Sequence, residues 1–196
     1  MYREHGFEVE QGVAACQLSH CGLPRHDKFR RYHKEFLGQD LDEAEVEVLC
    51  QSFARQVMQQ VLAAPAMPGA METLEQVLQA GIPCFLLSGT PQAELSEMVH
   101  ALDLAHYFLE VHGAPVSKTD MLRDILLRHG FEPSRCLFLG DGLVDYAAAS
   151  AWNVRFLGIV APGEQSQFPE QVPTSAKVAI PDFFSWDIWS KKSNSG

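Results

Sequence analysis

The feature that most constrains the fold is the alternation of short apolar runs with helical segments from about residue 67 onward. Residues 83–88 (PCFLLS), 136–139 (CLFL) and 154–160 (VRFLGIV) are apolar almost throughout, as expected of strands buried on both faces. Weaker strands are predicted near 108–112 and at 177–180. Helical segments of about 10–13 residues separate the runs, which predicts right-handed crossovers and a mostly parallel sheet. The chain is therefore expected to be an α/β protein.

The first third of the chain has a different pattern and predicts helices without a strand. Residues 26–37 place aromatic side chains at helical spacing, and residues 42–45 can form a capping box between Asp42 and Glu45. Leu49, Phe53, Val57 and Val61 then repeat every four residues, which predicts one buried stripe. We expect a small helical domain over residues 1–66 and an α/β domain over residues 67–196.

Helix ends in the second domain are also predicted from the sequence. Pro68-Gly69 is expected to begin a helix with an apolar face directed inward, formed by Met71, Leu74, Val77 and Leu78. Thr90 is expected to cap the next helix, with Pro91 in its first position.

Charge and cysteine content exclude several classes of protein. Fifteen Lys and Arg against 25 Asp and Glu give a formal net charge of −10, which argues against a general binder of nucleic acid or anionic membranes. No apolar run approaches the ~18–20 residues of a membrane span. The charged N-terminal decapeptide does not resemble a signal peptide, and the five cysteines form no metal-type pair. These features predict a cytoplasmic protein with reduced thiols.

Polar residues follow three of the predicted strands, at the edge where α/β sheets bind ligands. Ser88-Gly89-Thr90 follows the first strong strand. Ser88 offers a hydroxyl, Gly89 lets a ligand come close to the backbone, and the free amides at the start of the next helix favour an anion. The alternative is a tight turn with a Thr90 cap. Lys118 stands in the first turn of a helix, where a cation opposes the helix dipole and so indicates a local anion. The alternative is a solvated surface lysine.

The third group is Gly140-Asp141-Gly142-Leu143-Val144-Asp145, directly after the CLFL strand. Two carboxylates four residues apart, at a strand end and in the first helical turn, can converge on one point and suit Mg²⁺. The alternative is that Asp141 and Asp145 only cap the helix. Together with Ser88 and Lys118, however, they describe a site that handles phosphate.

At these residues the sequence resembles the haloacid dehalogenase-like (HAD) hydrolases, which are mostly Mg²⁺-dependent phosphatases. FLLSGT matches the family's second motif at Ser88, SKTDML the third at Lys118, and GDGLVD the fourth at Asp141 and Asp145. The resemblance covers residues 20–180 and implies a Rossmann-like three-layer core with a small helical cap. It implies catalytic roles for Ser88 and Lys118, which hold phosphate together with Gly89, and a metal site at Asp141 and Asp145.

The resemblance also assigns a substrate-facing segment and marks one departure from the family. Residues 23–29 (LPRHDKF) match the cap segment that faces substrate, so Arg25 and Lys28 could meet an anionic leaving group or form an exposed basic helix face. The family's first motif, a central strand followed by Asp-x-Asp, has no match. The only Asp-x-Asp, at residues 40–42, is explained by the capping box. We therefore expect an N-terminally truncated form, without its first central strand and without turnover by itself.

The leading prediction is thus a HAD-type phosphatase acting on a small phosphorylated metabolite with Mg²⁺. The alternative is a non-catalytic protein that binds phosphate or a partner through the remaining half-site. A receiver-like signalling domain is disfavoured, because no second acid at a strand end accompanies Asp141. The sequence indicates neither nucleic-acid nor membrane partners and leaves the substrate and the oligomeric state open.

Overall fold

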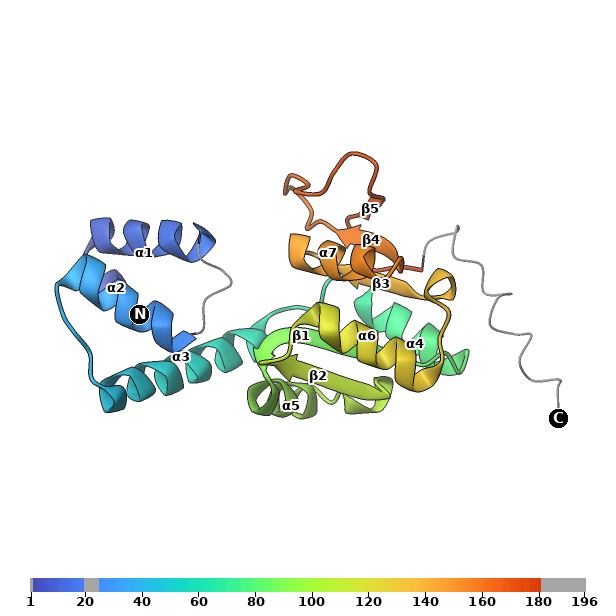
Figure 1. Cartoon of the computed structure of the whole chain (residues 1–196), viewed down its shortest axis with the longest axis horizontal. Helices are drawn as coiled ribbons and strands as arrows, with labels where there is room; N and C mark the ends of the chain where they lie inside the picture. The colour runs from blue at the N-terminus through green and yellow to red at the C-terminus, as the bar shows by residue number, and fades with distance from the viewer. Residues whose placement is uncertain (1, 20–24, 181–196) are drawn as a thin grey trace. The chain divides into compact units, whose positions relative to one another are not determined.

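The structure is a computed structural model that describes residues 2–19 and 25–180. It divides the chain into two compact units, Met1–Ala63 and Ala64–Gly196 (Figure 1). Within the described ranges, no helix is long and apolar enough to cross a membrane.

The first unit is entirely helical in its described residues. Its elements are a 3₁₀ turn at Tyr2–His5, α1 (Phe7–Ser19), α2 (Arg25–Tyr32), a π-helical turn at His33–Leu37 and α3 (Glu43–Ala63). The predicted capping box begins α3: the Asp42 amide donates to the Glu45 carboxylate and the Glu45 amide to the Asp42 carboxylate, both at 2.8 Å. This confirms the capping explanation of the only Asp-x-Asp in the sequence.

The core of the first unit lies between α2 and α3. Val46 is completely buried, Phe29 and Cys50 pack against it, and Phe53 meets the Phe29 ring edge to face. The stripe predicted to be buried on α3 is only half-buried at all four of its residues, Leu49, Phe53, Val57 and Val61, and that prediction was wrong. The buried residues of α3 are Val46 and Cys50.

The second unit alternates helices with short strands. Its elements are α4 (Ala70–Gln79), β1 (Phe85–Pro91), α5 (Gln92–Ala101), the 3₁₀ turn η3 (Ala105–Tyr107), β2 (Glu110–Ala114), α6 (Lys118–His129), the 3₁₀ turn η4 (Pro133–Arg135), β3 (Leu137–Gly140), α7 (Leu143–Ala151), β4 (Arg155–Ile159) and β5 (Thr174–Ser175).

The strands form two parallel sheets rather than one. β1 pairs with β2, with Phe85 opposite Glu110, and a second sheet has the order β3-β4-β5, with Leu137 opposite Arg155. Within the described residues β1 and β3 are not paired with each other. Helices α6 and α7 pack together, α6 contacting β1 and α7 contacting β3 and β4, so one helical layer covers both sheets (Figure 1).

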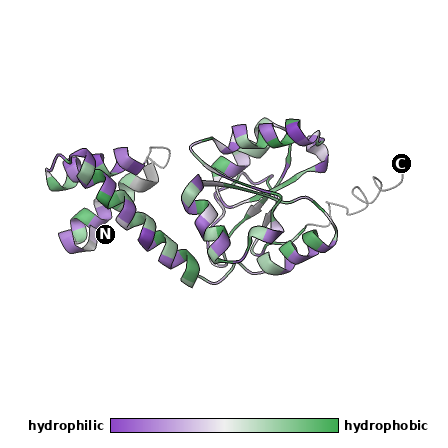
Figure 2. Ribbon diagram, turned by 90° about the horizontal axis from the view of Figure 1, so that it is seen from below, coloured by the Kyte–Doolittle hydropathy of each residue, from purple (hydrophilic) through white to green (hydrophobic). Residues whose placement is uncertain are grey.

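The core of the second unit lies between this helical layer and the strands. Leu122 and Leu126 of α6 meet Ala149 of α7 and Phe156 of β4, and Phe168 closes the cluster. Hydrophilic and hydrophobic residues alternate around the helices, as expected when one face is buried (Figure 2). The strong apolar runs thus form the predicted parallel strands, and the α/β class is confirmed.

Three local predictions for the second unit were wrong. The edge strand is Thr174–Ser175 instead of 177–180, because the Val178 amide donates to the Pro68 carbonyl at 2.8 Å and the Val178 carbonyl accepts from the Thr73 hydroxyl at 3.1 Å. Thr90 caps no helix, since β1 continues through Pro91 and α5 begins at Gln92 without a side-chain cap.

The third wrong prediction concerns the inward face of α4. Thr73 and Val77 are buried there, whereas Met71 and Leu78 are 39% and 43% exposed. The apolar face of α4 is therefore only half covered by the described chain.

Candidate active site

Ser88 and Gly89 lie within β1, between Leu87 and Pro91, where the register of β1 with β2 shifts. The Ser88 hydroxyl is half-buried and accepts a hydrogen bond from the Thr90 amide at 3.1 Å, while Gly89 is exposed. The first amides of α5, which begins directly after β1, have no side-chain cap and remain available as main-chain donors. Both observations suit the approach of an anion.

Gln92, which follows β1 directly, bonds to the main chain of β2. Its side-chain oxygen accepts from the Gly113 amide at 2.6 Å, and its side-chain nitrogen donates to the Val111 carbonyl at 3.2 Å. A Cβ on Gly113 would lie 2.6 Å from the Thr90 carbonyl oxygen, so only glycine permits this approach. Sequence reasoning missed Gln92 because a glutamine in a first helical turn carries no distinctive signal.

Lys118 begins α6, which is capped by Ser117 through a 3.1 Å bond from the Asp120 amide. The lysine ammonium donates to Oδ1 of Asp145 at 2.5 Å. The side chains of Lys118 and Asp145 are 21% and 4% exposed, so the pair is shielded from water. The local anion that the sequence predicted at Lys118 includes Asp145, and the solvated-lysine alternative is wrong.

The two acids after β3 have different environments. Asp145 is buried; its second oxygen, Oδ2, accepts from the Gly142 amide at 3.1 Å, which stabilises the start of α7. Asp141 is exposed, and its main-chain carbonyl accepts from the Gln167 side chain at 2.8 Å. Asp145 therefore both caps the helix and pairs with Lys118, whereas the carboxylate of Asp141 faces solvent.

The position of Asp145 requires a glycine at residue 140, because a side chain there would overlap the aspartate. A Cβ on Gly140 would lie 2.4 Å from the Asp145 Cβ and 2.8 Å from its Oδ2. The aspartate is thus packed directly on the strand end. This contact gives the Gly-Asp-x-x-x-Asp spacing a structural reason beyond the two acids.

A cavity of about 470 Å³ opens at the carboxyl ends of β3 and β4. Leu139 and Ile159 form part of its apolar wall, and Asp141, Glu164 and Gln167 contribute polar groups. Sequence reasoning missed the residues of the 160–168 loop, whose polar side chains follow no motif. The cavity is large enough to hold a small molecule beside Asp141.

The carboxylates of Asp141 and Asp145 fit the binding of a hard divalent cation only in part. Asp141 has an exposed carboxylate, while both oxygens of Asp145 are engaged by Lys118 and Gly142. Among the described residues, no group of three or more His, Cys, Asp or Glu side chains is placed to hold a metal ion. Mg²⁺ typically binds through one or two carboxylates with waters and a substrate phosphate, which Asp141 can satisfy.

Thiol chemistry is not favoured at this site. Burial raises the pKa of the Cys84 thiol and raises that of Cys136 to about 11. Both cysteines, which directly precede β1 and β3, are therefore protonated at neutral pH and weakly nucleophilic.

The two basic residues assigned to substrate recognition belong to the first unit. Arg25 lies 4.9 Å above the Phe53 ring, and Lys28 is half-buried on α2. Leu23 and Pro24 of the same segment lie outside the described residues. A role for Arg25 and Lys28 toward substrate stays a prediction.

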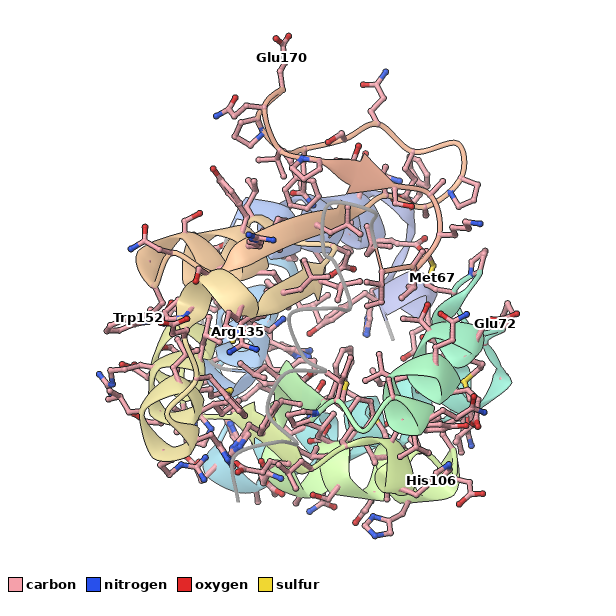
Figure 3. All side chains as sticks on the ribbon, turned by 90° about the vertical axis from the view of Figure 1, so that its right-hand side faces the viewer. Met67, Glu72, His106, Arg135, Trp152 and Glu170 are labelled. Atoms are coloured by element: carbon pink, nitrogen blue, oxygen red, sulfur yellow. The ribbon has the colours of Figure 1, made fainter. Side chains whose placement is uncertain are left out.

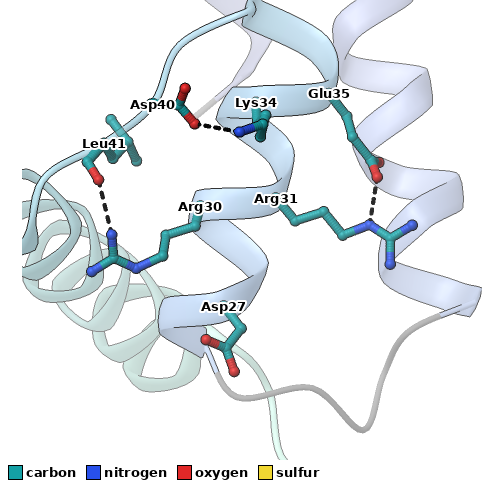
Figure 4. Close-up of a pocket in the computed structure, with 7 residues that line it drawn as sticks. All are labelled: Asp27, Arg30, Arg31, Lys34, Glu35, Asp40 and Leu41. Atoms are coloured by element: carbon teal, nitrogen blue, oxygen red, sulfur yellow. Dashed lines mark hydrogen bonds and ion pairs between the residues drawn. The ribbon is translucent and has the colours of Figure 1, made fainter.

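Arg30 and Arg31 of α2 and Lys34 of the π-helical turn that follows it line a cavity of about 440 Å³, and each lies beside an acid. Figure 4 shows the bonds of Arg31 and Lys34 to their acids and the bond of Arg30 to the Leu41 carbonyl. Lys34 donates to Asp40 at 2.8 Å, Arg31 donates to Glu35 at 2.8 Å, and Arg30 pairs with Glu43. An acid beside each of these cations lowers the positive potential in the cavity.

Comparison with known proteins agrees with this geometry. Residues 4–152 match the family described as haloacid dehalogenase-like hydrolase. Phosphoglycolate phosphatase 1 of Pseudomonas aeruginosa is 30% identical over 93 residues, which cover 45% of this chain and 34% of that protein. The matched part thus spans about a third of that relative.

Solved structures show the same fold. A HAD phosphatase from Thermococcus onnurineus has a TM-score of 0.61 and 16% identity, over 90% of this chain and 80% of that one. A HAD hydrolase of family IA from Entamoeba histolytica has a TM-score of 0.64 and 10% identity, over 84% and 79% of the two chains. At these identities the similarity concerns the fold alone.

Proposed function

The chain belongs to the haloacid dehalogenase-like hydrolase family, and from this premise we propose that it carries the phosphate-handling site of a Mg²⁺-dependent phosphatase for small metabolites. The observation that carries the proposal is the shielded ion pair between Lys118 and Asp145. It joins Lys118, which follows β2, to Asp145, which follows β3. Ser88 lies in the carboxyl-terminal part of β1, and Asp141 directly follows β3.

In this proposal Ser88 and Lys118 hold the oxygens of the phosphoryl group. The hydroxyl and the ammonium donate hydrogen bonds, and Gly89 lets the backbone come close to the guest. Lys118 has three N–H donors and gives one to Asp145, which leaves donors for phosphate.

Asp141 would hold Mg²⁺, with Asp145 in support. When bound, the ion neutralises charge that develops on the phosphoryl oxygens. Asp145 acts by orienting Lys118 and the Gly142 amide, because its oxygens are engaged there.

Binding of phosphate with Mg²⁺ is the first test, measured by titration calorimetry with inorganic phosphate and with phosphoglycolate. The second ligand is chosen because the Pseudomonas relative is named for it. We expect Mg²⁺ to strengthen binding, and Lys118→Ala and Asp141→Asn each to weaken it about tenfold or more, since each removes one charged contact.

Lys34→Ala and Asp124→Asn are the matched controls, because both remove an exposed charge to which the proposal assigns no role. Asp141→Asn also keeps the fold testable, since the Asp141 side chain is exposed. Binding that is equal in all four variants would contradict the proposal.

A second candidate, binding without hydrolysis, is favoured by the donor set. None of Ser88, Lys118, Asp141 and Asp145 is assigned the role of attacking carboxylate, so we expect this polypeptide alone to bind without releasing phosphate. A colorimetric phosphate-release assay with Mg²⁺ decides between the two. Release that Asp141→Ala abolishes would show that this chain hydrolyses substrate unaided.

A further inference from the structure

The regular pairing of β1 with β2 is interrupted where Ser88 lies. Leu87 stands opposite His112 and Pro91 opposite Ala114, so the three residues 88–90 of β1 face a single residue of β2, Gly113. Extra residues on one strand make a bulge, and a bulge redirects the side chains that it carries. We call residues 88–90 the Ser88 bulge. Its tip is open, since a Cβ added at Gly89 would meet no atom within 4 Å.

The bulge takes the main chain of β1 away from the Gly113 amide. Gly113 is buried, and a buried amide needs an acceptor. The acceptor is the side-chain oxygen of Gln92 at 2.6 Å, and the side-chain nitrogen of Gln92 donates to the Val111 carbonyl at 3.2 Å. The Gln92 side chain therefore bonds to β2 as a strand residue would, at the point where β1 leaves the ladder.

The bond to the Gly113 amide favours the bulge over a regular ladder. In a regular ladder a main-chain carbonyl of β1 would accept from this amide, and residues 88–90 would be drawn into the strand. Because Gln92 already occupies the amide, that pairing gains no hydrogen bond there. Gly113 contributes by having no side chain: a Cβ there would lie 2.6 Å from the Thr90 carbonyl oxygen and 2.7 Å from the Gln92 Cα.

The bulge also sets the direction of the Ser88 hydroxyl. The hydroxyl oxygen accepts from the Thr90 amide at 3.1 Å, which is a bond within the bulge. A hydroxyl that accepts one bond still has its own proton to donate. If the segment were drawn into a regular strand, this local turn would be lost and the hydroxyl would be redirected.

We propose that Gln92 is a positioning residue for phosphate binding: by bonding to the Gly113 amide it keeps the Ser88 bulge in place and so directs the Ser88 hydroxyl. The inference rests on the proposed function, in which Ser88 holds a phosphoryl oxygen. Gln92 acts through Ser88 and needs no contact with the substrate. It also ties the start of α5 to β2, the strand that leads to Lys118.

The first test follows the full chain by NMR without ligand. The backbone carbon chemical shifts of residues 88–90 report whether the bulge or a regular strand is present. Gln92→Met removes both bonds to β2 and keeps a side chain of similar length, so we expect these shifts to move toward strand values. Gln92→Glu keeps an acceptor for the Gly113 amide, and we expect its shifts at residues 88–90 to resemble those of the parent.

Two variants serve as controls for the shifts. Gln79→Met makes the same replacement and removes a 2.7 Å bond within α4. Glu72 of that helix lies at the periphery of the second unit (Figure 3). Ser96→Ala removes the 3.1 Å bond from Gln92 to its own helix and leaves both bonds to β2. We expect neither variant to change the shifts of the bulge.

The second test measures the binding of inorganic phosphate with Mg²⁺ by titration calorimetry. We expect Gln92→Met to weaken binding about fivefold to tenfold, as for the loss of one neutral hydrogen bond. In the Ser88→Ala background the same change should have less than about a twofold effect, because the group that Gln92 positions is already gone. Equal weakening in both backgrounds would mean that Gln92 does not act through Ser88, and the inference would be wrong.

Ser88→Ala separates this inference from the function on which it rests. If the parent binds no phosphate, or if Ser88→Ala binds it as well as the parent, the role of Ser88 in the proposed function is wrong and the inference with it. If Ser88→Ala weakens binding and Gln92→Met does not, the inference alone is overturned. Parent-like shifts in Gln92→Met would overturn it too, as would shift changes that spread to β4 and so reveal a general loss of structure.

Discussion

At the scale of single residues, the site depends on the direct packing of Asp145 against the end of β3. Its carboxylate bonds to Lys118 at 2.5 Å and to the Gly142 amide at 3.1 Å, while Gly140 leaves the space it needs. The acids and the lysine were predictable from the sequence because their types and spacing form a motif. The bond between Lys118 and Asp145 was not, since it joins residues that follow different strands.

Gly140→Ala tests this packing. The added Cβ would lie 2.4 Å from the Asp145 Cβ, so we expect the free energy of unfolding to fall by about 1–3 kcal/mol as the aspartate is displaced. Gly89→Ala is the control, because no atom lies within 4 Å of its added Cβ. Urea unfolding measures both, and equal stability of the two variants would contradict the argument.

At the scale of elements, the helix start with a reciprocal capping box was predictable from the sequence. Which residues of a helix are covered by the rest of the protein was not. The Asp42–Glu45 box lies within one segment, so its sequence alone specifies it. The prediction that Met71 and Leu78 of α4 are directed inward was wrong, because periodicity identifies the apolar side of a helix but not what covers that side. β5 was misplaced because Val178 pairs with Pro68, a contact distant in sequence.

The start of β2 carries a pH-sensitive group. Glu110 accepts two bonds from Arg128, at 3.0 and 2.6 Å, and lies 2.6 Å from Nε2 of both His129 and His112. The Arg128 bonds above all, with those of the histidines, lower the pKa of Glu110 from 4.5 to about 2. Its contribution to stability is therefore complete above pH 4.5 and is lost as the pH falls toward 2.

Glu110→Gln tests this dependence. We expect the variant to lose about 1–3 kcal/mol of unfolding free energy at pH 7, since a charged acceptor becomes neutral. The difference from the parent should shrink between pH 4.5 and pH 2. Urea unfolding at several pH values measures it, with Glu97→Gln as an exposed control. A difference that stays constant across this range would refute the assignment.

At the scale of the whole molecule, the second unit is two sheets joined through helices. Besides the Lys118–Asp145 pair, the Trp152 indole at the end of α7 donates to the Thr119 carbonyl in α6 at 2.9 Å. The α/β class was predictable, because buried strands and crossover helices leave strong periodic patterns. The division into two sheets depends on which strands pair, and pairing is a tertiary property.

Trp152→Phe tests whether this contact couples the sheets. We expect a loss of about 1 kcal/mol from the missing hydrogen bond. Hydrogen exchange of β2 amides should accelerate more than that of β4, which lies in the better-buried sheet. Tyr107→Phe, which removes a 3.4 Å bond to Glu75 at the surface, is the control. Equal acceleration in both sheets would show that the unit opens as one.

The ion pair of Lys118 has a consequence for the thermodynamics of recognition. A lysine on a surface samples many rotamers, and an anion that binds it must restrict them. Here Asp145 has already fixed the direction of the ammonium group. An arriving dianion therefore meets a preorganised cation, and the entropic penalty of association is smaller than for a freely rotating lysine.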